Sequence, residues 1–215
     1  MNVTILGASG GCGQALVDQA VERGHVVTAV VRSPAYRAPA AVRTLVGDLT
    51  SADFLRSAVR GSDVVFSALG LRMQGMAPWN RPPQPDFLER STPALVSAAK
   101  AENVTRLLAI SAAGVGDSFA QMPSIFRLVI KHSGLKHVYP ELEKMERVLL
   151  QSGLDVCICR PTGLTDGPRL KQVVVCRTFT GRATISRADV AWWMLEQAAA
   201  PSFSERTPII TTTGA

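Results

Sequence analysis

The chain has 215 residues, of which 47% are hydrophobic and 19% are charged. This composition is that of an ordinary globular protein, and it excludes a chain that is disordered throughout. Lys plus Arg number 23 and Asp plus Glu number 17, so the net charge is +6. The positive residues are scattered, with no basic block and no interleaved aromatic residues, and we therefore expect no nucleic-acid partner.

Glycine-rich turns and short apolar runs alternate with helical periodicities along the chain. Strands are expected at Val3–Leu6, His25–Arg32, Val42–Asp48, Asp63–Gly70, Arg106–Gly114, Asp155–Pro161, Val173–Cys176 and Pro208–Thr211. Helices are expected at 11–23, Ser51–Val59, Thr92–Glu102, Pro140–Ser152 and Ser186–Ala199. Strands that are apolar on both faces indicate a parallel sheet between two helix layers. The sequence therefore predicts an α/β fold of Rossmann type, a doubly wound parallel sheet in three α/β/α layers.

Two stretches, 71–86 and 115–138, interrupt this alternation. Each follows the carboxyl end of a predicted strand, where ligands of such sheets bind. They are either walls of a substrate site or ordinary surface loops, and Met73, Met76 and Trp79 either line that site or pack a loop. We predict one NAD(P)-binding domain over 1–215, with a small substrate lobe formed by these two stretches and by 162–185.

The four cysteines, Cys12, Cys157, Cys159 and Cys176, have neither the pattern of a disulfide framework nor zinc-ligand spacing. We expect reduced thiols. No targeting segment is visible before the first predicted strand, and no apolar run approaches the ~18 residues of a membrane span. These features favour a cytoplasmic protein with no membrane partner.

The first predicted strand runs into a glycine-rich turn that has Gly7, Gly10 and Gly13 in the spacing G-x-x-G-x-x-G. The first glycine permits a tight turn, the second lets the backbone approach a pyrophosphate, and the third lets helix and strand pack closely. The amino end of the following helix has free N–H groups and a partial positive charge that bind an anion. The segment predicts a dinucleotide site, and the alternative is a purely structural turn.

The end of the second predicted strand indicates which dinucleotide binds. NAD sites usually have an acidic residue there, but none lies between Glu22 and Asp48, and Arg32 stands at the strand end. A forked guanidinium suits a 2′-phosphate, so the sequence favours NADP(H) over NAD(H). Ser33 and Arg37 are additional candidates for that phosphate. Asp48 either accepts a hydrogen bond from the adenine amino group or caps the next helix.

Short motifs stand after successive predicted strands: G-A-S-G-G-C-G, A-V-V-R-S, G-D-L, S-A-L-G and I-S-A-A-G, followed later by I-S-R-A-D-V-A. Together they cover nearly the whole chain and resemble the atypical short-chain dehydrogenase/reductases. Within that group the chain is similar to NAD(P)H-binding, NmrA-like proteins and to proteins related to biliverdin-IXβ/flavin reductase. The resemblance implies a Rossmann sheet, an NADP(H) cofactor and a small-molecule substrate over the nicotinamide. Members of this size are often monomers or homodimers.

The resemblance also assigns roles to individual residues. It places at the cofactor phosphates Gly7, Ser9, Gly10, Gly11, Cys12 and Gly13. It places Arg32 at the 2′-phosphate, and Asp48 and Leu49 at the adenine. The residues expected to flank the ribose are Ala68, Leu69 and Gly70. Ser111 is expected to face the nicotinamide, with Pro161 and Thr162 behind it.

The proton donor that is usual in the broader family is not intact. It is a Tyr-x-x-x-Lys pair, in which the lysine lowers the tyrosine pKa, and a serine holds the substrate oxygen. Ser111 and Tyr139 fit the serine and tyrosine roles, and they are the catalytic candidates. Glu143, however, stands at the lysine position, and Lys144 is one place too far, about 100° away around a helix. A carboxylate near the phenol is expected to raise the tyrosine pKa.

These observations predict an NADPH-dependent oxidoreductase that transfers hydride to a small aromatic or conjugated substrate. Two alternatives stay open. One is a non-catalytic NADP(H)-binding redox sensor or regulator, because the usual catalytic pair is missing. The other is a redox-neutral epimerase or dehydratase that retains its cofactor.

Overall fold

A computed structural model describes residues 1–180 and 182–212, which fold around one large sheet. The strands of this sheet stand in the order β3-β2-β1-β4-β5-β6-β10-β8. They are β1 (Asn2–Leu6), β2 (Val26–Val31), β3 (Arg43–Val46), β4 (Val64–Ser67), β5 (Arg106–Ile110), β6 (Asp155–Pro161), β8 (Val173–Cys176) and β10 (Ile209–Thr212). All neighbours are parallel except β8, which runs antiparallel to β10 at one edge. The predicted parallel sheet is confirmed apart from this edge strand.

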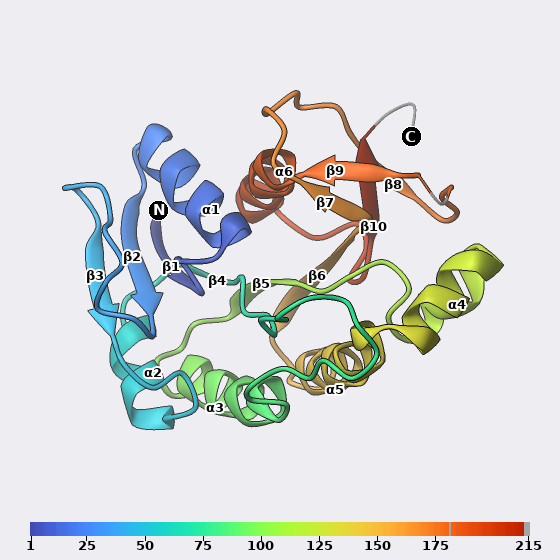
Figure 1. Ribbon diagram of the computed structural model, residues 1–215. Helices are drawn as coiled ribbons and strands as arrows, with labels where there is room; N and C mark the ends of the chain where they lie inside the picture. The colour runs from blue at the N-terminus through green and yellow to red at the C-terminus, as the bar shows by residue number, and fades with distance from the viewer. Residues whose placement is uncertain (181, 213–215) are drawn as a thin grey trace.

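Helices cover both faces of the sheet. The α-helices of the described residues are α1 (Gly11–Glu22), α2 (Ala52–Val59), α3 (Phe87–Ala101), α4 (Ser124–His132), α5 (Tyr139–Leu150) and α6 (Arg187–Ala199). In Figure 1, α1 and α6 lie on one face, and α2, α3 and α5 lie on the other. Helix α1 contacts α6, and α3 contacts both α2 and α5. The predicted three-layer arrangement is therefore confirmed.

The central strand β1 shows why the strands are apolar on both faces. Val3 and Ile5 point into the core beneath α1 and α6, while Leu6 points into the core against α2, α3 and α5. Thr4 is the polar residue of this buried run, and its hydroxyl donates to the Ala58 carbonyl at 3.1 Å. Two-sided burial of this kind requires a helix layer on each side.

The strand order also fixes where a ligand can lie. Strands β2 and β3 extend from one side of β1, and β4, β5 and β6 extend from the other. Connections leave in opposite directions at such a point, and a crevice opens outside the carboxyl ends of the strands. The β1–α1 turn and the segments that follow β2 and β4 therefore meet at one edge.

Helix α3 begins at Phe87, five residues before the predicted start at Thr92. In the structure Pro93 stands inside the helix. Phe87 and Leu88 are buried, and their packing anchors the additional first turn in the core. The predicted strands 63–70 and 106–114 are also shorter, because they end at Ser67 and Ile110.

The stretches proposed as a substrate lobe differ in structure. Stretch 115–138 contains the 3₁₀ helix η1 (Gly116–Gln121), α4 and the 3₁₀ helix η2 (Gly134–His137), whereas 71–86 is irregular. The two touch, since the Gly134 N–H donates to the Met76 carbonyl at 2.9 Å. Stretch 162–185 includes β7 (Gly163–Thr165), which pairs with β9 (Thr184–Ser186) in a small parallel sheet. The lobe itself stays a prediction. Within the described ranges, no helix combines the length and apolarity that a membrane crossing requires.

Candidate cofactor and substrate site

The glycine turn between β1 and α1 has no space for side chains on its inner side. Gly7 has a φ of +76°, and a Cβ atom there would lie 2.6 Å from the Ala68 carbonyl oxygen. A Cβ atom on Gly13 would overlap the Gly7 carbonyl oxygen. Gly10 is the N-cap of α1, no side chain caps the helix, and its first turn has no acidic residue. The free N–H groups at this end are therefore available to an anionic ligand.

A cavity of about 810 Å³ opens over this turn at the crevice in the sheet. The predicted cofactor residues that line it are Gly7, Ser9, Gly10, Gly11, Arg32, Leu49, Ala68, Leu69 and Gly70. Ser33, a further candidate for the 2′-phosphate, lines it as well. Six other lining residues had no assigned role at the cofactor: Val31, Leu71, Arg72, Gln84, Phe87 and Arg187. The described lining thus contains three arginines and no carboxylate, so the cavity suits an anion.

Other predicted residues lie outside this lining: Cys12, Gly13, Asp48, Ser111, Tyr139, Pro161 and Thr162. Cys12 packs against the core beneath α1, and burial raises the pKa of its thiol to about 11. The Thr162 hydroxyl is buried and hydrogen-bonded to the Thr211 hydroxyl at 3.0 Å, and the Thr162 N–H donates to the Ile210 carbonyl at 3.1 Å.

Asp48 shapes the turn before α2. Its carboxylate accepts from the Thr50 N–H at 2.9 Å and from the Thr50 hydroxyl at 2.8 Å, and these bonds lower its pKa. The cap of α2 is Ser51, whose hydroxyl accepts from the Phe54 N–H. The helix-capping alternative for Asp48 is therefore wrong, and its contact with adenine stays a prediction.

Arg32 is held at the cavity wall by residues more than fifty positions away. Its Nη1 donates to Gln84 Oε1 at 2.6 Å, and its guanidinium carbon lies 4.6 Å from the centroid of the Phe87 ring. Gln84 accepts a hydrogen bond in the plane of the guanidinium, and the Phe87 ring covers one face of it. These two contacts fix the orientation of the guanidinium group. The candidate Arg37 instead donates to the carbonyls of Pro34 and Tyr36 in its own loop.

Arg187, the first residue of α6, lies against the glycine turn. A Cβ atom on Gly11 would be 2.5 Å from Arg187 Cδ, and Arg187 Nη1 donates to Asp166 Oδ1 at 2.6 Å. The Arg187 side chain is 30% exposed and the Asp166 side chain 90%. The I-S-R-A-D motif is the only sequence signal for this residue, because 176 positions separate Arg187 from Gly11, which it touches.

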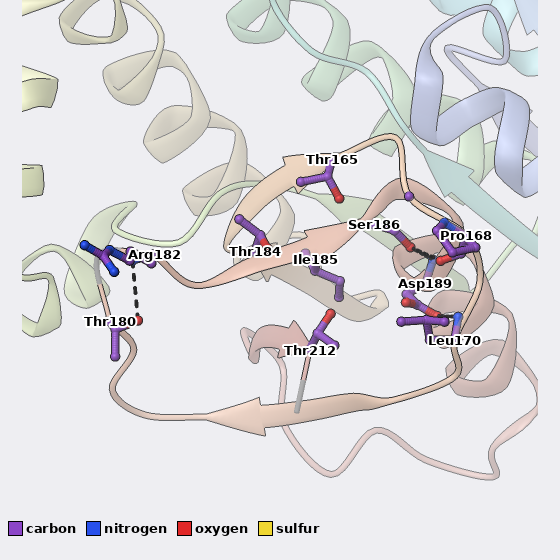
Figure 2. Close-up of a pocket in the computed structure, with 11 residues that line it drawn as sticks. Thr165, Pro168, Leu170, Thr180, Arg182, Thr184, Ile185, Ser186, Asp189 and Thr212 are labelled. Atoms are coloured by element: carbon purple, nitrogen blue, oxygen red, sulfur yellow. Dashed lines mark hydrogen bonds between the residues drawn. The ribbon is translucent and has the colours of Figure 1, made fainter. Parts of the chain in front are cut away.

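Figure 2 shows how the start of α6 is fixed beside a second cavity of about 620 Å³. The Ser186 hydroxyl accepts from the Asp189 N–H at 2.9 Å and donates to the Pro168 carbonyl at 3.0 Å. The buried Asp189 carboxylate accepts from the N–H groups of Leu170 and Lys171. Ser186 thus caps α6, and the Asp189 carboxylate holds the loop that contains Asp166.

The catalytic candidates lie at the carboxyl end of β5 and the start of α5. Ser111 is buried, and its Oγ has no hydrogen-bond partner. The Tyr139 hydroxyl donates to the Ala113 carbonyl at 3.0 Å, and burial raises its pKa to about 12. The cause is burial alone rather than the expected carboxylate, since Glu143 lies along α5 beside Arg147 at 3.9 Å.

Lys144 is held away from this tyrosine. Its Nζ donates to Glu89 Oε2 on α3 at 2.7 Å and to Glu141 Oε1 at 2.9 Å. Both carboxylates raise the lysine pKa, so the ammonium group stays charged and bound. Lys144 therefore has no means of lowering the pKa of Tyr139 in this arrangement.

Comparisons with known proteins agree with this geometry. The model of a protein family described as NAD(P)H-binding matches residues 7–201. ChuY, an anaerobillin reductase from Escherichia coli O157:H7, is 21% identical with a TM-score of 0.79, and the match covers 100% of this chain and 98% of that one. A short-chain dehydrogenase/reductase from Veillonella parvula DSM 2008, in complex with NADP, is 19% identical over 99% and 95% of the two chains, with a TM-score of 0.79.

A third solved structure is a Rossmann-fold NAD(P)-binding family protein from Shigella flexneri. It is 22% identical with a TM-score of 0.71, and the match covers 100% of this chain and 94% of that chain. At these identities the structural matches establish a common fold, while the family model identifies a common ligand class.

Proposed function

This chain belongs to the NAD(P)H-binding family whose model matches residues 7–201. From that premise we propose that it is an NADPH-dependent oxidoreductase of the atypical short-chain dehydrogenase/reductase type, acting on a small aromatic or conjugated substrate. One observation carries the proposal. The cavity at the crevice joins the uncapped amino end of α1 to three arginines, with no carboxylate in its described lining. Such a lining favours a ligand with phosphates at more than one position.

We assign Arg32 to the 2′-phosphate of the cofactor. The side chain already points along the cavity wall, and its partner Gln84 is a neutral amide. A phosphate forms stronger, charge-assisted bonds with a guanidinium than an amide does, so it would replace Gln84 without rebuilding the wall. Arg72 lines the same cavity and adds positive charge. The 2′-hydroxyl of NADH would form no bond of comparable strength with Arg32, so this wall favours NADPH over NADH.

We assign the pyrophosphate to the α1 end, with Arg187 beside it. The Arg187 side chain already covers Gly11, and its present partner Asp166 is largely exposed to water. Exposed ion pairs contribute little free energy, so the guanidinium is free to exchange Asp166 for a phosphate. Cys12 and Gly13, in the first turn of α1, are assigned to the phosphates through their backbone. Pro161 and Thr162 keep their predicted place behind the nicotinamide.

When bound, the reduced cofactor supplies the hydride, and the protein must orient the substrate and provide one proton. Ser111 is the best-placed residue for orientation, because its buried hydroxyl has no partner of its own. Tyr139 is a weak acid with a raised pKa, and its proton is committed to the Ala113 carbonyl. We therefore assign Ser111 to the polar atom of the substrate and give Tyr139 the smaller role of fixing the Ser111–Ala113 segment.

A non-catalytic NADP(H)-binding sensor is the second candidate, and the binding of Lys144 by two glutamates favours it. Calorimetric titration with NADPH and NADH, followed by NADPH consumption with quinones, flavins and enones, tests both candidates. We expect tighter binding of NADPH and turnover of at least one acceptor class. Tight binding without turnover supports the sensor, and substrate conversion without net NADPH loss supports a redox-neutral enzyme. A lack of binding by both nucleotides would overturn the proposal.

A further inference from the structure

Two segments, 71–85 and 118–140, form one outer surface, which we call the basic surface. They are packed together at Gly134, whose N–H donates to the Met76 carbonyl at 2.9 Å. A Cβ atom on Gly134 would lie 2.5 Å from Met73 Cε and 3.2 Å from the Asn80 carbonyl oxygen. Helix α4, within the second segment, projects from the end of the molecule beyond α5 (Figure 1). The surface therefore includes a protruding helix and the loop packed beside its base.

The basic surface has positive charges that no acid neutralises. Neither segment contains Asp or Glu, and the cations are Arg72, Arg81, Arg127, Lys131 and Lys136. Among the described residues, none of these five pairs with a carboxylate. The acids that flank the segments are already paired elsewhere: Asp86 with Arg90, Asp117 with Arg160, and Glu141 with Lys144. The surface thus presents five cations that have no carboxylate partner among the described residues, and one of them, Arg72, also lines the cofactor cavity.

Large apolar side chains of the same two segments are also exposed. Trp79 is 80% exposed, and on α4 Ile125 is 63%, Leu128 53% and Val129 42% exposed. The three α4 residues follow the i, i+3, i+4 spacing of a single helix face, while Ile130 faces the protein and is buried. Single exposed apolar residues are ordinary, but a group of them rimmed by charge is typical of a contact surface.

The charge distribution decides what this surface contacts. A second copy of the chain, docked through the same face by two-fold symmetry, would bring the basic surface against itself and oppose like charges. A bilayer with anionic headgroups has the complementary charge, and its soft interface admits a projecting helix. Basic residues together with Trp and aliphatic side chains on one face are the composition of helices that lie in that interface.

We propose that the basic surface docks on an anionic lipid bilayer, with the apolar face of α4 and Trp79 at headgroup depth. This contact is peripheral and requires no spanning helix, so it departs from the expectation of no membrane partner, which rested on the lack of an apolar run long enough to span a bilayer. Arg72 belongs both to the basic surface and to the lining of the cofactor cavity, so docking would bring that cavity close to the lipid. A substrate dissolved in the membrane would then reach the carboxyl edge of the sheet without crossing open water.

Flotation of the full chain with lipid vesicles tests the proposal. We expect binding to phosphatidylcholine vesicles that contain phosphatidylglycerol, much weaker binding to phosphatidylcholine alone, and release by salt. Lys131→Glu should weaken binding roughly tenfold, because a single cation near an anionic surface already contributes a factor of about five. The matched control is Arg43→Glu, which changes the net charge equally at an exposed site on β3, at the other edge of the sheet. It should bind almost like the unchanged chain.

Leu128→Ser separates apolar insertion from charge attraction. It should lower vesicle binding several-fold at unchanged net charge, and the fluorescence shift on binding should disappear in Trp79→Phe. Thermal melting of each variant shows whether the fold is kept. Equal binding to neutral and anionic vesicles, or no effect of Lys131→Glu, would overturn the proposal. So would tighter binding to polyglutamate than to vesicles, which assigns an acidic protein partner, or a homodimer that Lys131→Glu dissociates.

Discussion

The β1–α1 turn and the β5–α5 region lie at the same edge of one sheet, yet they are built on different principles. The turn depends on backbone geometry: Gly7 and Gly10 permit a close turn into the uncapped amino end of α1, where phosphate binding requires main-chain N–H groups more than side chains. The β5–α5 region depends on side chains meeting, and there Tyr139 bonds to a carbonyl while Lys144 bonds to two glutamates. A short sequence motif is therefore enough to predict phosphate binding. Proton transfer instead needs two side chains to meet, and here Tyr139 and Lys144 bond to other groups.

Gly10→Val should have the largest effect, because it destroys the backbone-built region. A Cβ atom there already lies 3.3 Å from the Gly7 carbonyl oxygen, and the two additional methyl groups would extend into the space assigned to the pyrophosphate. Calorimetry should show at least a hundredfold loss of affinity for NADPH and NADH alike. Retained binding in a protein with an unchanged melting temperature would show that this helix end does not hold the phosphates.

Arg32→Glu should come next, and it tests selectivity rather than binding as such. Charge-assisted bonds contribute about 1.5–3 kcal/mol each, so the loss of one guanidinium and the gain of a repelling carboxylate should weaken NADPH binding about a hundredfold. NADH affinity should change little. Arg37→Glu is the matched control: Arg37 donates to two carbonyls of its own loop, so this variant should leave the affinity for both cofactors unchanged. Equal losses for NADPH and NADH would reassign Arg32 to another part of the nucleotide.

Arg187→Ala should have a smaller effect that is shared by both nucleotides. We expect roughly a tenfold loss for NADPH and NADH, because one charge-assisted contact to the pyrophosphate disappears. Binding of 2′-AMP, which has no pyrophosphate, should stay unchanged. Asp166→Asn should act in the opposite direction and raise the affinity slightly, since it frees the Arg187 guanidinium. A loss for 2′-AMP as well would indicate that Arg187 supports the shape of the cavity instead.

The sequence predicts features that depend on neighbours along the chain, and it misses those that depend on folding. The alternation of strands and helices, the glycine turn and the position of Arg32 at a strand end follow from local pattern. Gln84 and Phe87, which hold Arg32, stand more than fifty residues later on a loop and the start of a helix. No periodicity links them to a strand end, so the wall that they form was not predictable.

Two further cases show the same limit at the helix ends. The capping role weighed for Asp48 belongs to Ser51, because two acceptors competed within four residues and the backbone geometry decided between them. Tyr139 was expected to have its pKa raised by Glu143, but burial raises it, and burial depends on packing that a sequence does not show. In both cases the sequence showed the kind of interaction, a helix cap and a raised tyrosine pKa, but not the residue or environment responsible for it.

Tyr139→Phe should have the smallest effect on activity, and it tests the β5–α5 region. The variant loses one hydrogen bond to Ala113, about 1 kcal/mol of folding free energy, and should keep most of any reductase activity. In the folded chain the tyrosine pKa is raised to about 12, against about 10 unfolded, so below pH 10 both states are protonated and the stabilising effect is complete.

As pH rises from about 10 to 12, the unfolded chain loses the phenolic proton before the folded chain does. The unchanged protein should therefore lose about 2 kcal/mol more stability over this range than Tyr139→Phe. Urea unfolding of both proteins at pH 9 and at higher pH measures the difference. Parallel stability curves would show that the phenol is not buried as described. A thousandfold loss of activity at neutral pH would instead make Tyr139 the proton donor and place the β5–α5 region with the usual short-chain enzymes.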